Sequence, residues 1–158
     1  MEKPTLYMET TIPSYLLAEP SRDVLVLARQ EITRMWWKRD QSRYAIFVSA
    51  VVMTEAARGD RKAAKKRVEF LGQFSVLEPT PEVQALFDLY LEKGVVPPGN
   101  AEDAAHLAFA SIYKMEYLCT WNFKHLANVL ALRRLRQLNE KRGFFVPQVC
   151  TPEELLGE

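Results

Sequence analysis

Three acidic side chains carry the chemistry that the sequence suggests. Glu9 follows a short apolar stretch, Glu55 lies in a helical segment, and Asp103 lies in the first turn of another. Two carboxylates about 4 Å apart repel by roughly 4 kcal/mol at an effective dielectric near 20, so acids that converge need a cation between them. Mg²⁺ or Mn²⁺ would suit oxygen ligands, polarise a phosphodiester and lower the pKa of bound water. If they converge, the three acids therefore indicate phosphodiester hydrolysis.

Each acid also has a simpler interpretation. Glu9 could cap the helix that begins near Ile12, and Asp103 could complement the dipole at a helix N-terminus. Glu55 could be a solvated helix residue, because glutamate is a good helix former. The metal hypothesis therefore depends on whether the fold brings all three to one place.

Short apolar runs alternate with helical segments along the chain. Strands are predicted at 5–8, 44–48, 74–77 and 117–120, and a last strand at 144–150 is broken by Pro147. Helices are predicted from residue 10 or 11, and at 22–38, 50–58, 60–71, 81–93, 101–114, 123–142 and from 152. In the second helix the apolar stripe is expected to be Leu25, Ala28, Ile32, Met35 and Trp36.

This alternation predicts an α/β fold, a three-layer sandwich with a mostly parallel sheet of about five strands and helices on both faces. Ligands of such sheets bind beyond the carboxyl ends of the strands. Glu9, Ser49 and Asn122 directly follow or end predicted strands, and Glu55 lies little more than one helical turn beyond Ser49. In this topology Glu9, Glu55 and Asp103 can face one rim of the sheet.

The sequence resembles the PIN-domain ribonucleases, and especially the VapC-like toxins of type II toxin–antitoxin pairs. The resemblance covers nearly the whole chain and lies in four segments: 7–16 (YMETTIPSYL), 48–55 (VSAVVMTE), 102–110 (EDAAHLAFA) and 120–126 (TWNFKHL). It implies a parallel five-stranded sandwich that binds Mg²⁺ or Mn²⁺, cuts RNA and is held inactive by a small antitoxin protein. Carried over by position, Glu9, Glu55 and Asp103 match the first three acids of the family.

Two positions depart from the family pattern. Glu9 stands where the family usually has aspartate, and its side chain is one methylene longer, so the ion or the carboxylate must shift. Asn122 stands where a fourth acid is often aspartate; its amide oxygen can still bind water or a hard cation, but one negative charge is lost. We expect weaker metal binding as a result. Glu102 adjoins Asp103 but points about 100° away on the helix, and we favour Asp103 as the ligand.

Basic and aromatic residues suggest contacts with RNA and with proteins. The densest basic stretch begins one turn after Glu55, and we expect it to guide RNA phosphates or to be only a solvated helix face; it contains Arg58, Arg61, Lys62, Lys65, Lys66 and Arg67. His106 lies three residues after Asp103 and could join the metal shell, or be a packed core histidine. Trp37 falls outside the apolar stripe and could anchor a homodimer or an inhibitory peptide, or be buried under the loop 40–44.

Composition excludes several classes of protein. The 158 residues are 48% hydrophobic with a formal net charge of +1, which fits one globular domain over 1–158 and neither a strongly basic nucleic-acid binder nor a disordered acidic chain. Cys119 and Cys150 lie in apolar surroundings without metal-ligand spacing, which fits core thiols in a reducing cytoplasm. No signal peptide or membrane-spanning run is recognised, so a cytoplasmic location without membrane contact is expected.

Two other functions remain open. The departures at Glu9 and Asn122 would also suit a catalytically inactive PIN-fold module that binds RNA or protein. A phosphoacceptor receiver domain also gathers acids at strand ends, but it needs a nucleophilic aspartate where this chain has Glu9 or Asn122. The sequence contains no glycine-rich phosphate loop, which argues against an NTPase or a dinucleotide enzyme.

Overall fold

The chain folds around a five-stranded parallel sheet with the strand order β3-β2-β1-β4-β5, as seen in a computed structural model that describes residues 2–157. The strands are β1 (Thr5–Met8), β2 (Ala45–Ser49), β3 (Ser75–Leu77), β4 (Tyr117–Cys119) and β5 (Gln148–Cys150). The central strands are buried on both faces, as Leu6, Tyr7 and Met8 of β1 illustrate. The predicted α/β sandwich with a parallel five-stranded sheet is therefore confirmed.

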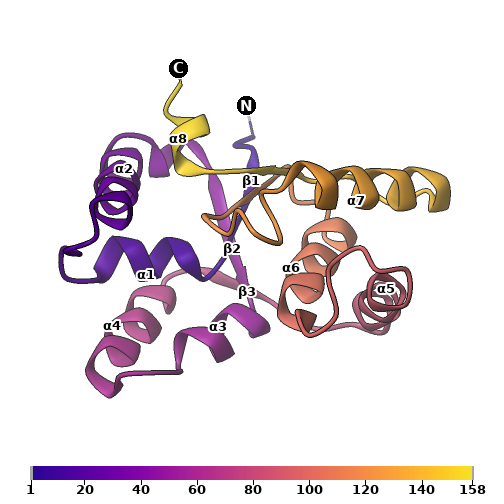
Figure 1. Ribbon diagram of the computed structural model, residues 1–158, viewed down its shortest axis with the longest axis horizontal. Helices are drawn as coiled ribbons and strands as arrows, with labels where there is room; N and C mark the ends of the chain where they lie inside the picture. The colour runs from indigo at the N-terminus through magenta and orange to yellow at the C-terminus, as the bar shows by residue number, and fades with distance from the viewer. Residues whose placement is uncertain (1, 158) are drawn as a thin grey trace.

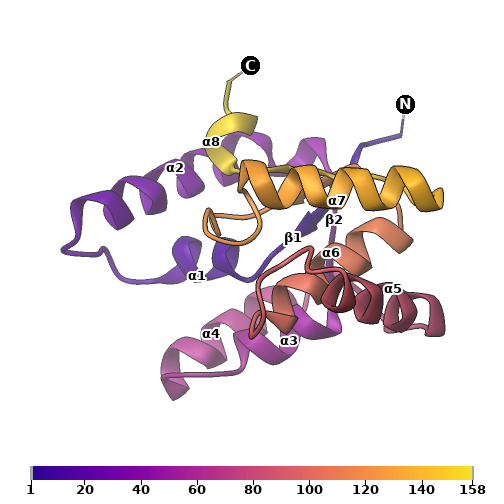
Figure 2. The same ribbon diagram turned by 45° about the vertical axis from the view of Figure 1, so that its right-hand side comes forward.

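Helices cover both faces of the sheet (Figure 1). They are α1 (Thr11–Leu17), α2 (Val24–Asp40), α3 (Ala50–Ala56), α4 (Arg61–Leu71), α5 (Pro81–Glu92), α6 (Ala101–Ile112), α7 (Val129–Arg142) and α8 (Pro152–Leu155). In Figure 1, α1 and α2 lie on one side of the strands, and α5, α6 and α7 lie on the other. Figure 2, turned by 45°, again shows α5 and α6 side by side.

The strand order reverses direction between β1 and β4. From β1 the chain proceeds outward to β2 and β3, and from β4 it proceeds outward to β5 on the opposite side. Such a reversal opens a crevice at the carboxyl ends of the two strands, because their following connections leave in opposite directions. Glu9 directly follows β1, and Thr120 directly follows β4, so both lie at this reversal point.

Local sequence signals account for most helix starts. Side chains of Ser49, Asp60 and Thr80 accept hydrogen bonds from the first turns of α3, α4 and α5. Asp23 is the N-cap of α2, and its side chain accepts from the amides of Leu25 and Val26. Thr10 occupies the N-cap position of α1 without making a cap, because its hydroxyl bonds Glu55 instead.

The apolar stripe predicted for α2 is wrong in part. Leu25 and Met35 are 63% and 60% exposed and Ala28 is exposed, whereas Trp36 is buried as expected. The buried face otherwise carries Gln30, Thr33 and Asp40. These polar side chains can be buried because each has partners: Gln30 Oε1 accepts from the Ser21 amide, Thr33 Oγ1 from the Trp121 indole, and Asp40 from two arginines.

Three further details correct the sequence prediction. The last long helix begins at Val129 and not at residue 123, because Asn128 caps it by accepting from the amides of Leu130 and Ala131. The last strand covers only Gln148–Cys150. Trp37 is half-buried and packs against Phe70 and Phe74, so it is not the fully exposed anchor that the sequence allowed.

Two findings concern the cysteines and the ability of the helices to cross a membrane. Cys119 and Cys150 are paired in register on β4 and β5, and both are buried and free. Among residues 2–157 no helix combines the length and the apolar character that crossing a membrane requires.

Candidate metal centre at the strand reversal

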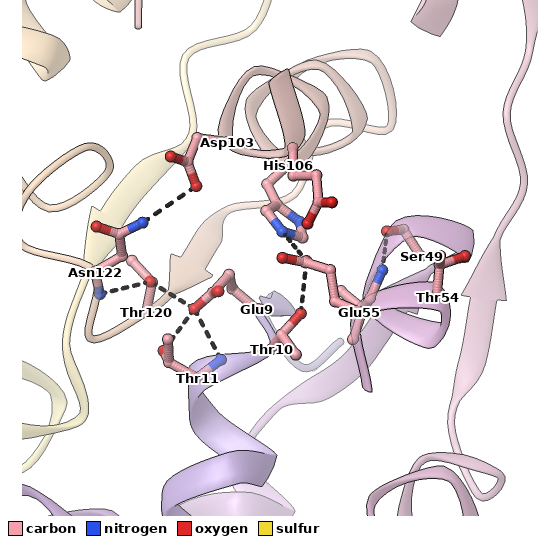
Figure 3. A network of polar contacts seen from close by, with 12 residues as sticks. Glu9, Thr10, Thr11, Ser49, Thr54, Glu55, Asp103, His106, Thr120 and Asn122 are labelled. Carbon is pink, nitrogen blue, oxygen red and sulfur yellow. Dashed lines mark hydrogen bonds and ion pairs between the residues drawn. The ribbon is translucent and has the colours of Figure 1, made fainter. Parts of the chain in front are cut away.

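Glu9 is the most buried acid at the reversal point. Its backbone amide continues the pairing of β1 by donating to the Cys119 carbonyl, and its side chain is only 4% exposed. Oε1 accepts three hydrogen bonds: from the backbone amide of Thr11 at 3.1 Å, from the Thr11 hydroxyl, and from the Thr120 hydroxyl at 2.7 Å. Two elements on either side of the crevice therefore fix one carboxylate (Figure 3).

Burial raises the pKa of Glu9. The positive charge of His106 and the hydrogen bonds from Thr11 and Thr120 favour the ionised form, but they offset only part of the desolvation. A cation beside this carboxylate would remove the remaining penalty. Glu9 is thus an ionisable group whose charge the surrounding protein satisfies incompletely.

Glu55 faces Glu9 from α3, because the Ser49 cap starts that helix at the carboxyl end of β2. Its Oε1 accepts from the Thr10 hydroxyl at 2.8 Å and lies 2.5 Å from His106 Nε2. Burial opposes ionisation of Glu55, but the hydrogen bond and the charge of His106 outweigh it and lower the pKa of Glu55 to about 2. Glu55 is therefore a carboxylate at neutral pH.

His106 is fully buried, and both of its ring nitrogens have partners. Nε2 meets Glu55, and Nδ1 lies 2.6 Å from the hydroxyl of Tyr7, which in turn lies 2.7 Å from the Ser49 hydroxyl. The hydrogen atoms of the Tyr7 and Ser49 hydroxyl groups can rotate. The hydrogen bonds that link His106, Tyr7 and Ser49 can therefore form whether His106 is neutral or charged. Burial opposes the charged form, but the hydrogen bond to Glu55 and the charges of Glu9, Glu55 and Asp103 raise the pKa of His106.

One ligand atom each from Glu9, Glu55 and His106 lies within 4.8 Å of the others, which makes this group a candidate metal centre. The sequence singled out the two acids and weighed His106 as either a ligand or a packed histidine. The structure brings all three together from β1, α3 and α6. His106 sits one turn after Asp103, so helical spacing was the signal for it.

Asp103 and Asn122 form the second half of the site. Asn122 Nδ2 donates to Asp103 Oδ1 at 3.1 Å, and Figure 3 shows this pair on the side of Glu9 opposite Glu55 and His106. Burial raises the pKa of Asp103, while the charges of His106 and His125 act against that rise. Asp103 lies outside the group of three within 4.8 Å, so the structure presents a more compact cluster than the predicted set of three acids.

The hydroxyl groups of the site escaped the sequence analysis. Thr10 and Thr11 stand at the start of a predicted helix, and Thr120 ends a predicted strand. The hydroxyl of Thr10 donates to Glu55, and those of Thr11 and Thr120 donate to Glu9. Glu102, weighed in the sequence analysis only as a neighbour of Asp103, pairs with Arg58 at the surface, and its hydrogen bond to Glu55, followed by burial, raises the pKa of Glu102. No sequence pattern distinguishes these partners from ordinary caps and surface acids.

The predicted RNA-contacting residues fall into two groups, one paired near the site and one exposed on α4. Arg58 pairs with Glu102 near Glu55, whereas Arg61, Lys62 and Lys65 are exposed on α4. Arg67, from the same basic stretch, donates to the carbonyls of Ala56 and Arg58 and so ties α4 to α3. An exposed basic face thus lies on the helix that follows the site.

Comparison with known proteins identifies the fold. No protein-family model matches the chain, and no curated protein matches it. Among solved structures, VapBC-1 from nontypeable Haemophilus influenzae matches at 17% identity with a TM-score of 0.57, over 94% of this chain and 98% of that one. VapBC2 from Rickettsia felis, solved bound to a DNA fragment from its promoter, matches at 15% identity with a TM-score of 0.54, over 93% and 98%. The chain therefore has the fold found in these VapBC structures, as the resemblance implied.

Proposed function

We propose that this chain, as a single PIN-like domain over residues 1–158, is a metal-dependent endoribonuclease of the VapC type. It hydrolyses RNA phosphodiester bonds in the cytoplasm and is the toxin of a toxin–antitoxin pair. One observation carries the proposal: two carboxylates and a histidine from three separate elements converge within 4.8 Å at the strand reversal. A protonated His106 offsets part of the cost of this convergence, but burial still raises the pKa of Glu9, so a bound cation would further stabilise the ionised carboxylates.

The donor set fits a divalent cation. Glu9, Glu55 and Asp103 would supply carboxylate oxygens, with the amide oxygen of Asn122 beside Asp103. Mg²⁺ and Mn²⁺ prefer such oxygen ligands, and the imidazole of His106 is better tolerated by Mn²⁺. When bound, the ion would polarise the phosphodiester and lower the pKa of a bound water.

The residues around the acids hold them in place for this chemistry. Thr11 and Thr120 restrain the buried Glu9 carboxylate from two sides. Thr10 and His106 do the same for Glu55. Such preorganisation means that the ligands need little rearrangement when an ion and an RNA phosphate arrive.

Protein and RNA partners follow from the same proposal. The two solved structures above are VapBC proteins, which supports a small antitoxin as the partner of this chain. A homodimer is a further expectation. For the RNA backbone we propose Arg58 beside the site and Arg61, Lys62 and Lys65 on α4, because exposed cations attract phosphates.

A catalytically inactive binding module is the second candidate. It is favoured by Asn122, which places an amide where a carboxylate would add charge. Divalent-metal affinity separates the two candidates, since only the nuclease requires it.

The deciding experiment is a calorimetric titration of the metal-free protein with Mn²⁺ and with Mg²⁺. The nuclease proposal predicts one saturable binding event for Mn²⁺ that Glu9→Gln and Asp103→Ala weaken at least tenfold. Asp88→Asn on α5, an exposed acid outside the site, is the matched control and should leave binding unchanged. Absence of saturable binding by the wild type would favour the inactive module.

A further inference from the structure

A pocket of about 300 Å³ opens between α3, α5 and α6, next to the candidate metal centre. Figure 2 shows these three helices together at the lower side of the molecule. Its walls are mainly apolar and include two aromatic rings; they comprise Val51, Thr54, Val83, Gln84, Phe87 and Phe109. Because Glu55 of the candidate metal centre is part of its lining, the pocket is a candidate binding site for a ligand of that centre.

Glu55 belongs to both the pocket and the metal centre. Its carboxylate contacts His106 and Thr10 in the centre, and the same residue lines the pocket. A ligand that places a phosphate at the centre can therefore extend one substituent past Glu55 into the pocket. Arg58 and Glu102, paired at 2.5 Å, stand at the same wall and keep this boundary polar.

We propose that this pocket binds one nucleobase of the RNA strand, from a nucleotide adjacent to the bond that is cut. This inference rests on the proposed nuclease function and specifies its substrate recognition. Single-stranded RNA is recognised by splaying out bases and stacking them on aromatic side chains, and the half-buried ring of Phe87 offers such a surface, whereas Phe109 borders the pocket with only 2% of its surface exposed. The volume lies at the lower end of ligand pockets, which suits one planar ring better than an extended peptide segment.

Gln84 gives the pocket a polar group that can bind the edge of a base. Its Nε2 donates to Asp88 Oδ1 at 3.0 Å, which orients the amide and leaves Oε1 as the free acceptor. An acceptor at the rim can accept from the exocyclic amino group of adenine, cytosine or guanine, or from the ring N–H of uracil or guanine. Gln84 can therefore hold the edge of any of the four bases without selecting among them.

The test combines a pocket-filling variant with RNAs that lack one base. The cleavage position in a short single-stranded RNA is first mapped with the wild type and Mn²⁺. Binding is then measured by fluorescence anisotropy with Ca²⁺ in place of Mn²⁺, using intact RNA and RNAs with one abasic nucleotide at each position near the cut. Gln84→Trp fills the pocket, and Ala85→Trp, on the next exposed residue of α5 outside the lining, is the matched control.

We expect one abasic position beside the cut to weaken wild-type binding at least tenfold, since stacking of one base has about that value. Gln84→Trp should weaken binding of intact RNA similarly and be insensitive to the same abasic position, while Ala85→Trp behaves like the wild type. If removing one base weakens binding to the wild type but not to Gln84→Trp, that base is the one bound in the pocket.

Three results would overturn the inference. If the wild type cuts RNA but Gln84→Trp retains full affinity and the abasic pattern, the pocket inference fails and the nuclease stands. If the wild type neither binds nor cuts RNA, the proposed function fails and the inference falls with it. If Gln84→Trp converts a wild-type dimer into monomers in light scattering, the pocket is instead an interface between copies of the chain.

Discussion

At the scale of single residues, the site combines groups that destabilise the fold with groups that restrain them. Glu9 is buried with an incompletely satisfied charge, whereas Glu55 and His106 satisfy each other. The two acids therefore respond differently to substitution and to pH. Each response can be measured on the metal-free protein, where binding of an ion cannot obscure it.

Glu9→Gln is expected to stabilise the metal-free protein. Burial raises the pKa of Glu9, so its ionised form opposes folding at neutral pH, and Gln keeps an oxygen for the Thr11 and Thr120 donors. Thermal unfolding at pH 7 should shift upward by about 2–5 °C, a gain that disappears below pH 4.5, where the wild-type carboxyl is protonated when unfolded as well. A lower melting temperature for Glu9→Gln at pH 7 would contradict this account of the charge.

His106→Gln is expected to destabilise the protein most at mildly acidic pH. The raised pKa of His106 means that its charged form contributes stability that is fully present below its unfolded value of 6.5 and is lost as pH rises through the folded value. Urea unfolding should give a loss of about 1–3 kcal/mol at pH 6 and a smaller loss at pH 9. His125→Gln, on the loop near Asp103, is the control, and an equal loss at both pH values would refute a charged His106.

The sequence could predict the acids of the site but not what restrains them. Glu9, Glu55 and Asp103 were recognisable from their positions after strands and at a helix start, and from the family resemblance. The roles of Thr10 and Thr120 depend on which elements the fold places side by side. A threonine next to a helix start has the same local pattern whether it caps that helix or bonds an acid 45 residues away, as Thr10 does.

At the scale of elements, strands were easier to predict than the faces of helices. Buried parallel strands are short apolar runs, so β1, β2 and β4 were recognisable within a residue of their true bounds. The stripe on α2 failed because that helix buries Gln30, Thr33 and Asp40 in hydrogen bonds and exposes Leu25 and Met35. Periodicity of apolar residues cannot reveal a buried face that is satisfied by polar partners.

Thr33→Val on α2 tests this polar face directly. It removes the oxygen that accepts from the indole of the buried Trp121 at 2.7 Å, leaving the N–H without a partner. We expect a loss of about 1–3 kcal/mol in chemical unfolding, although Val is the more apolar residue. Met35→Ala, at an exposed position of the same helix, should change stability by no more than about 0.5 kcal/mol. A larger loss of stability for Met35→Ala than for Thr33→Val would instead support the apolar stripe predicted from the sequence.

At the scale of the whole molecule, charge is distributed unevenly although the net charge is only +1. The acids gather at the strand reversal, and exposed cations lie on α4, which follows α3 and its Glu55. In Figure 1, α4 and the far end of α7 lie at opposite ends of the molecule. This separation permits a comparison of two basic surfaces on one protein.

Replacing Arg61, Lys62 and Lys65 with Gln should flatten the salt dependence of RNA binding. Each lost phosphate contact should reduce the slope of log affinity against log salt by about 0.7 for a single strand. The control replaces three cations away from the site, Lys93, Lys141 and Arg142, which line a hollow between α5 and α7. Equal slopes for both triple variants would indicate that α4 does not guide the RNA.

The central claim is that the acidic group at the strand reversal cuts RNA with the help of a divalent ion. The most direct measurement is cleavage of a mixed RNA pool by the purified protein with Mn²⁺, with Mg²⁺ and with chelator, beside Asp103→Ala and Glu9→Gln. We predict cutting that requires the metal and is lost in both variants. Cutting that persists in the variants or in chelator, or no cutting by the wild type with either metal, would contradict the claim.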